Sequence, residues 1–314
     1  MGLLLLAAAC GGSGGDARGR AVEADSAGIL VVTSTVPAWD AGETWRVDTT
    51  PELVIGDATK LPSVLLVWIT GARRLANGHV VVVSDDDQSI RWFDQRGAEI
   101  RRVARSGSGP GEFRHITLVG MLGDSLLLWD GQRDRATVLT RDGEPARTIE
   151  LRADSGVVLD APVVSGLFAD GRVLVAGQSR AVSTMASALR RDSIPLAIAS
   201  PDGHITRVLT QVPGHENVVV TGAGFVTMLP RPFGARTLVA ADDASVLVSP
   251  GDLDEVVRYA ADGSVAAIYR VERPRRLITD LEIEQQRLRL AEQVKQLPAP
   301  LDQAVADAMA GVRV

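Results

Sequence analysis

From Gly28 onward the chain consists of short apolar runs separated by small polar residues. The runs include GILVVTSTV, HVVVVSD, DSLLLWD, RVLVAG and TLVAAD. Runs of this length, rich in Val, Leu and Ile and bounded by Gly, Asn, Asp or Ser, are typical of β-strands. No helical pattern of ordinary length appears before residue 275. The pattern therefore predicts an all-β fold over most of the chain.

Two kinds of glycine turn alternate along these runs. First turns lie around Gly78, Gly123, Gly171 and Gly234, and second turns end at Gly97, Gly143, Gly203 and Gly263. Asp-Gly or Asn-Gly between apolar runs predicts a hairpin whose two central residues have positive φ. Two hairpins give four antiparallel strands in about 45 to 60 residues, the size of a propeller blade. Because such a sheet is apolar on both faces, neighbouring blades must stack around an axis.

The stretch SGSGPGEF, residues 106–113, lies between the last strand of one unit and the first strand of the next. It lacks the following helix and the Lys-Ser or Lys-Thr pair of a phosphate loop, so we interpret it as a crossing between blades. Its glycines allow the backbone to reverse and its proline stiffens the corner. We expect the phenylalanine to wedge between blades and the glutamate to accept backbone N–H groups, with a ligand contact as the alternative for the glutamate. The predicted corner residues are Gly107, Gly109, Pro110, Gly111, Glu112 and Phe113.

A hairpin ending in FDQRG, a GxGPGEF corner and a strand ending in LLLWD together resemble the NHL-like six-bladed β-propellers of bacterial lipoproteins. The resemblance extends from about residue 28 to residue 270. It implies a six-bladed propeller of four-stranded antiparallel blades. Only four units are recognisable, so residues 28–70 should supply a fifth blade and part of the closing blade, and the last blade should be incomplete. The alternative is a five-bladed ring closed by the N-terminal strands.

The chain opens with MGLLLLAAACGGSGG, whose apolar run is too short to span a bilayer and reads as a signal-peptide core. Small residues before Cys10 and a Gly/Ser stretch after it resemble the lipobox and spacer of bacterial lipoproteins. The sequence therefore predicts lipidation of Cys10 and a location in the bacterial cell envelope, in the periplasm or at the outer membrane. The alternative is an incidental thiol. Because Cys10 is the only cysteine, no intrachain disulfide can form.

Three segments follow from these patterns. We expect a signal-peptide remnant, lipidation site and tether over 1–26, a propeller over 27–275, and a helical excursion with the start of a truncated blade over 276–314. Thr279 and Glu282 form a capping box, and Leu281, Leu288 and Ala291 fall on one helical face. The helix is expected to pack on the rim of the propeller.

A net charge of −6 and a pI near 5.3 argue against nucleic acid as a partner, because binding to phosphates requires a basic face. The lipid anchor is then the only expected contact with a membrane.

Strand parity indicates where a ligand should bind. In a four-stranded blade the crossing and the loop between the second and third strands emerge on the same face, and loops on a rigid scaffold commonly carry binding residues. An aspartate at a strand end also forms turns with its own backbone, and the DDD run is an alternative calcium patch. The candidate ligand-binding residues are Asp85, Asp86, Asp87, Arg105, Arg114, Asp130, Arg133, Asp242 and Asp243.

No catalytic constellation emerges from the sequence. No GxSxG elbow follows a predicted strand, and His79, His115, His204 and His215 lack the spacing of a zinc site. The five tryptophans, all in the first half, are expected between blades, with a sugar-stacking platform as the alternative. The favoured function is a non-catalytic scaffold that binds an envelope protein, peptide or glycan without a cofactor. The alternative is a propeller hydrolase or lyase with a metal in its channel, because the resemblance extends to ring folds that include lactonases and amidating lyases.

Overall fold

The structure is a computed structural model that describes residues 21–36, 46–56, 66–104, 106–109, 111–178, 189–222, 225–295, 303 and 305–306. Three antiparallel sheets of four strands each, and four antiparallel strands of a six-stranded sheet, form its four blades. Blade 1 contains β3 (Ile69–Arg74), β4 (Val80–Ser84), β5 (Ser89–Phe93) and β6 (Glu99–Ala104). Blade 2 contains β7 (Ile116–Leu122), β8 (Ser125–Asp130), β9 (Arg135–Leu139) and β10 (Pro145–Glu150).

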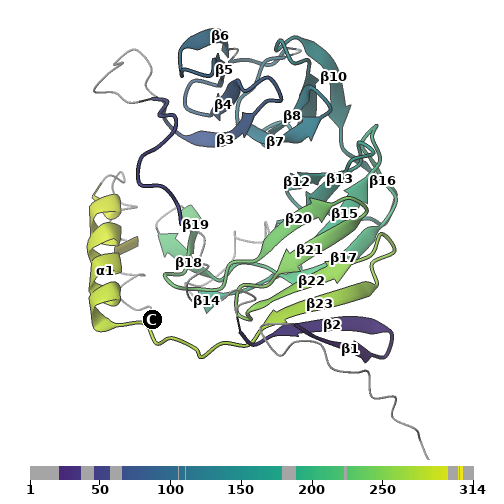
Figure 1. Ribbon diagram of the computed structural model, residues 1–314, viewed down its shortest axis with the longest axis vertical. Coiled ribbons are helices and arrows are strands. Elements are labelled where there is room, and N and C mark those ends of the chain that lie inside the picture. Colours follow the sequence, from purple (N-terminus) through teal and green to yellow (C-terminus); the bar gives the residue numbers. More distant parts are fainter. Residues whose placement is uncertain are drawn as a thin grey trace, which may run out of the picture.

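The next two blades repeat this order. Blade 3 contains β12 (Val163–Leu167), β13 (Val173–Ala176), β15 (Ser193–Ala199) and β17 (Val208–Pro213). Blade 4 contains β20 (Leu238–Asp242), β21 (Ser245–Ser249), β22 (Glu255–Tyr259) and β23 (Val265–Val271). The first strands, β3, β7, β12 and β20, contact one another in sequence along the inside of the arc in Figure 1. The protein is an all-β propeller of four-stranded antiparallel blades with a C-terminal helix.

Both faces of a blade are apolar because successive residues of a strand point to opposite sides. In β8, Leu126 and Leu128 pack against blade 1, whereas Leu127 and Trp129 pack against blade 3. A third cluster joins blades 3 and 4 through residues such as Leu196. Neighbouring blades therefore bury each other's apolar faces, as the repeat predicts.

The glycine turns form hairpins with one difference from the expected geometry. In the β5–β6 turn the Gly97 N–H donates to the Asp94 carbonyl over 3.0 Å, and Gly97 has a φ of 82°. The residues between them do not have positive φ, and the pairing shifts register next to Phe93. The expectation of two positive-φ residues is wrong because the turn is longer and ends in a left-handed glycine beside a bulge.

The N-terminal strands extend blade 4 and do not start a blade of their own. β2 (Ile29–Ser34) pairs in parallel with β23, and β1 (Val22–Ser26) pairs with β2 at the edge of a six-stranded sheet. β1 also occupies the end of the segment expected to be a tether. Residues 46–56 contain no strand, and Ile55 packs on the outer face of blade 1. The expectation that residues 28–70 supply a fifth blade is therefore wrong for the described part of that range, and β2 instead joins the last blade.

A small inserted sheet accounts for the irregular third and fourth units. β14 (Leu189–Arg190) pairs with β18 (Asn217–Gly222), which forms a hairpin with β19 (Phe225–Pro230). The first turn of blade 4 is consequently the β20–β21 turn, in which Asp243 has a φ of 38°. The expected first turn at Gly234 is wrong, because Gly234 lies in the connection from the inserted sheet to blade 4. Two further short strands, β11 (Arg152–Ala153) and β16 (His204–Ile205), pair in parallel.

Helix α1 (Asp280–Val294) begins with the expected capping box of Thr279 and Glu282. Leu281 and Leu288 are exposed, and none of the helix residues is buried. Figure 1 shows α1 standing beside the blades. The half-buried apolar positions include Ile283 and Leu290 instead, so the predicted packing face is wrong.

Candidate functional site

The candidate site lies on the face at which the chain crosses from one blade to the next, which we call the corner face. It carries the β4–β5, β8–β9 and β21–β22 loops and the β6–β7 crossing. The opposite face carries the glycine turns, and we call it the turn face. The inserted sheet also belongs to the corner face, because it arises from the β13–β15 loop and the β17–β20 crossing.

Glu112 holds the corner together from inside. Its Oε2 accepts hydrogen bonds from the backbone N–H groups of Ser108 and Gly109, each over 2.7 Å. A Cβ added at Gly107 would collide with this oxygen, so a larger residue at this position would force the Glu112 carboxylate to move. The carboxylate therefore has the structural role expected for it and points into its own loop.

Two further residues complete the corner. Phe113 is 1% exposed and belongs to the core between blades 1 and 2. Arg135 donates to the carbonyl groups of Gly109 and Glu112 over 3.0 and 2.6 Å. The expected wedge is confirmed, and an arginine from β9 fixes the loop above it.

Asp85 links blade 1 to blade 2. Its Oδ1 accepts the backbone N–H of Ile116 over 2.6 Å, and its Oδ2 lies 2.6 Å from His115 Nδ1. Asp85 is buried, whereas about half of the His115 side chain is exposed. The Asp85 carboxylate thus orients the imidazole of His115. It also joins the β4–β5 loop of blade 1 to the start of β7, the first strand of blade 2.

The other residues of the DDD run point to different partners. Asp87 pairs with Arg91 over 2.7 Å and with Arg102 over 2.5 Å, while Asp86 is exposed. Hydrogen bonds from Ser89 and Arg91 lower the pKa of Asp87 and outweigh its desolvation. The three carboxylates therefore do not converge, and the described residues contain no cluster of three His, Cys, Asp or Glu that would hold a metal ion.

Asp130 is fully buried and holds the end of the same β6–β7 crossing. It accepts the backbone N–H groups of Arg114, His115 and Gln132 over 3.1 to 3.3 Å. Arg133 donates to the Ser108 carbonyl over 3.0 Å and thereby contacts the corner. Both predicted residues lie on the corner face, where they stabilise loops.

Asp242 and Asp243 lie elsewhere. They belong to the β20–β21 turn, which connects the first and second strands of blade 4 and emerges on the turn face. Their predicted place beside the corner is therefore wrong, because the inserted sheet shifts the start of the fourth unit. Cys10, Arg105 and Pro110 lie outside the described residues, as do Trp39 and Trp45.

The described tryptophans differ in burial. Trp92 and Trp129 are buried between blades. Trp68 is 73% exposed, and its carbonyl accepts the N–H of Asp85 over 3.0 Å. Trp68 therefore presents an aromatic surface on the corner face.

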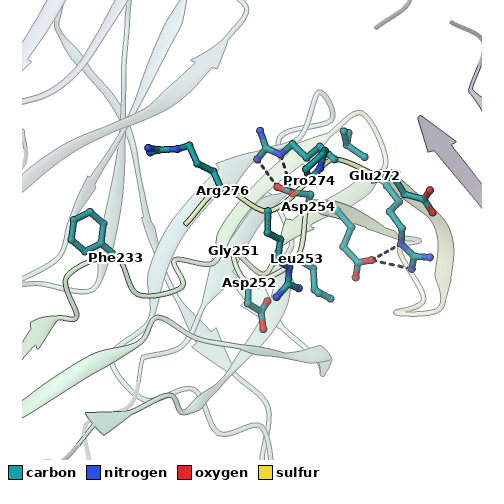
Figure 2. Close-up of a pocket in the computed structure, with 13 residues that line it drawn as sticks. Phe233, Gly251, Asp252, Leu253, Asp254, Glu272, Pro274 and Arg276 are labelled. Carbon is teal, nitrogen blue, oxygen red and sulfur yellow. Dashed lines mark hydrogen bonds and ion pairs between the residues drawn. The ribbon is translucent and has the colours of Figure 1, made fainter. Parts of the chain in front are cut away.

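A charged cavity of about 1060 Å³ lies on the corner face of blade 4, lined by residues 251–255, residues 270–276 and Phe233 (Figure 2). We call it the arginine cavity. Arg273 forms a two-bond pair with Asp254, and Arg270 forms one with Glu255. These residues were not among the sequence candidates, although the run ERPRR after the last strand was a usable signal.

The electrostatics of the arginine cavity follow from these pairs. Hydrogen bonding to Arg273 holds the pKa of Asp254 below its ordinary value, and the Asp254 carboxylate raises the pKa of Arg273. Arg191 donates to Asp252 over 2.6 Å and lowers the pKa of that carboxyl group as well. Arg275 and Glu272 form no ion pair with any described residue, and both are exposed. One positive and one negative side chain at the cavity are thus available to a ligand.

Two of the histidines pair with an aspartate at separate places among the described residues. The Asp85–His115 pair orients an imidazole in the manner of a general base, but no Ser, Cys or Lys among the described residues hydrogen-bonds to it. His204 pairs with Asp154 over 2.6 Å at a separate, exposed position.

Among the described residues, no helix has the length and apolar character that a membrane crossing requires.

No protein-family model and no curated protein matches the chain. Among solved structures, a putative exported protein from Bacteroides fragilis is similar at 14% identity and a TM-score of 0.40, with 70% of this chain and 55% of that chain covered. The Myxococcus xanthus glutaminyl cyclase is similar at 11% identity and a TM-score of 0.32, covering 74% and 77%. A streptogramin B lyase is similar at 14% identity and a TM-score of 0.32, covering 66% and 70%. The chain spans just over half the length of the Bacteroides protein.

Proposed function

We propose that the protein is a non-catalytic, exported β-propeller, anchored in the cell envelope through Cys10, that binds a protein or peptide segment in the arginine cavity. The anchor is supported by the apolar N-terminal run that ends at Cys10 and by the Gly/Ser stretch that follows. Binding is supported by the cavity itself, which is large enough for several side chains of a partner.

One observation carries the binding proposal: the exposed Arg275 lies in the same cavity as the exposed Phe233. Arginine and aromatic residues are enriched in protein interfaces, where they contribute much of the binding energy. The neighbouring pairs Arg273–Asp254 and Arg270–Glu255 hold the cavity wall in place. A segment with an acidic side chain for Arg275 and an apolar side chain for Phe233 fits this surface.

Selection from a random peptide library on the purified protein tests the proposal. We expect the selected peptides to combine acidic and apolar residues and to bind Arg275→Glu about tenfold more weakly, because reversing the charge removes one contact of interface strength. Arg141→Glu is the matched control, since Arg141 is an exposed arginine in a turn on the turn face. Equal losses in both variants, or selected peptides without acidic residues, would contradict binding at this cavity.

A further inference from the structure

A second cavity, of about 480 Å³, lies on blade 4 beside the arginine cavity, and we call it the groove. The two cavities share residues 253–255 and 270–271, together with Gly251 and Arg273, so they are continuous. The groove also has lining residues that the arginine cavity lacks, namely Val32, Ser34, Ser249, Val256 and Tyr269. None of these five is charged. The charged arginine cavity therefore continues into an uncharged and largely apolar surface.

The groove lies on the side of blade 4 that points away from blade 3. Val248 belongs to the core between blades 3 and 4 and pairs with Val257 of the next strand. Because successive residues of a strand point to opposite sides, Val256 points away from that core. Tyr269 of β23 lies directly opposite Val256, and Val32 of β2 lies directly opposite Tyr269. These three residues therefore form a row across the outer side of the sheet, where they line the groove.

Apolar side chains in the groove are accessible to a partner. Val271 is 51% exposed, Leu253 is 48% exposed and Tyr269 is 37% exposed. Val32 and Val256 are half-buried beside them. Burial of apolar surface favours association, and aromatic residues are enriched at the centres of protein interfaces. The groove thus offers hydrophobic contacts next to the charged side chains of the arginine cavity.

Val271 and Arg275 limit the distance between the apolar and the cationic part of this surface. Val271 ends β23, and Arg275 follows four positions later. Four residues of extended chain span at most about 14 Å, so a short segment of a partner can contact both.

We infer that the two cavities together bind one extended peptide segment. An acidic side chain of the segment lies at Arg275, and a second apolar side chain, within about four positions of the acidic one, lies on Val271 and Tyr269. A chain that occupies the arginine cavity enters the groove because the two cavities are continuous. This inference rests on the proposed peptide binding and specifies the pattern of residues that the segment carries.

Selection from the random peptide library gives the first test. Besides the apolar residue for Phe233, we expect the selected peptides to carry a second apolar or aromatic residue within about four positions of the acidic one. Selected peptides that lack this second apolar residue would overturn the inference.

Val271→Asn tests the groove directly. Asparagine is close to valine in size and uncharged, so it removes the apolar contact and leaves the charge of both cavities unchanged. We expect a fluorescently labelled selected peptide to bind this variant about tenfold more weakly in an anisotropy titration, the effect of losing one contact of interface strength. Leu238→Asn is the matched control, because Leu238 is an exposed apolar residue of β20 that lines neither cavity. Leu238 lies on the same outer side of blade 4, since its neighbour Val239 packs against blade 3.

The variants separate this inference from the proposed function. If Arg275→Glu weakens binding and Val271→Asn does not, peptide binding at the arginine cavity stands and the inference fails. If Arg275→Glu has no effect, the proposed function fails and the inference fails with it. Equal losses in Val271→Asn and Leu238→Asn would overturn the inference, because binding would then involve the whole outer side of blade 4. Light scattering that shows a dimer dissociated by both of these substitutions would also overturn it and would assign this side to a second copy of the chain.

Discussion

Asp85, in the loop that follows β4 of blade 1, accepts a hydrogen bond over 2.6 Å from the backbone N–H of Ile116, the first residue of β7 in blade 2. Ile116 is fully buried, so no water can replace the carboxylate. A side chain on the corner face thus fixes the distance between the innermost strands of two blades. The same aspartate was a sequence candidate for ligand binding.

Replacing Asp85 should therefore affect stability first. We expect Asp85→Ala to lower the free energy of unfolding by about 2 to 3 kcal/mol, because it leaves a buried N–H group without an acceptor. Asp86→Ala is the matched control and should change stability by less than about 0.5 kcal/mol, since Asp86 is exposed. Urea unfolding followed by tryptophan fluorescence measures both. Similar values for the two variants would contradict the bridging role of Asp85.

The second prediction is that Gly107 and Glu112, both in the corner, are coupled in their effects on stability. A methyl group at Gly107 would collide with the Glu112 carboxylate, which is held by the N–H groups of Ser108 and Gly109. We expect each of Gly107→Ala and Glu112→Ala to cost about 1 to 3 kcal/mol. The double variant should cost less than the sum, because the second change removes the group with which the methyl collides.

A double-mutant cycle from chemical denaturation measures this coupling. We expect a coupling energy of at least about 1 kcal/mol between the two positions. Gly107→Ala combined with Asp86→Ala is the control and should be additive. An additive Gly107–Glu112 pair would show that the carboxylate does not limit the space at the corner.

These local features were predictable because they depend on neighbouring residues. The second turns at Gly97 and Gly263 have the expected positive φ, and Glu112 closes a loop of its own chain within four residues. Turn chemistry and hairpin pairing act over a few positions, so a short pattern contains the information.

Long-range pairings were not predictable in the same way. β2 pairs with β23 across most of the chain, and β14 pairs with β18 across a blade. In neither case does a turn sequence between the two strands indicate that they pair. Because the β14–β18 pairing was not foreseen, the predicted start of blade 4 was wrong. Asp243 was consequently predicted on the corner face, whereas it lies on the turn face.

The arginine cavity was missed for a related reason. Its residues Arg273 and Asp254 meet across 19 positions of the chain. Strand parity indicated the face on which the arginine cavity opens, because parity follows from strand direction alone. It could not indicate which loops would enclose a volume.

The N-terminus gives a third prediction. If Cys10 carries the acyl chains of a lipoprotein, the protein expressed with its leader in a bacterial host should partition into the detergent phase of a Triton X-114 separation. Two or more acyl chains anchor a protein stably, whereas one chain binds only marginally. Cys10→Ser should move the protein to the aqueous phase and abolish labelling by radioactive palmitate. Ser13→Cys in the Cys10→Ser background controls for thiol chemistry, and recovery of the label in that variant would contradict a site-specific anchor.

The start of α1 gives a prediction about pH. Hydrogen bonds from Arg276 and from both the backbone N–H and the hydroxyl of Thr279 lower the pKa of Glu282 from its ordinary value to about 2. Because the pKa is lower in the folded state, the carboxylate stabilises the first turn at pH above 4.5, the value for the free side chain. This contribution is lost as the pH falls from 4.5 towards 2. Amide hydrogen exchange at Glu282 and Ile283 should therefore show protection at pH 6 and a loss of it at pH 2.5 to 3.

Glu282→Gln should remove this pH dependence while keeping part of the capping box, because glutamine can also accept the Thr279 N–H. Protection of the first turn should then be lower at pH 6 and nearly constant down to pH 3. Glu284→Gln is the matched control, since Glu284 is an exposed glutamate of the same helix that pairs only with Arg287 over 3.7 Å. If Glu284→Gln flattens the profile as much as Glu282→Gln does, the acid sensitivity belongs to the general charge of the helix and not to its cap.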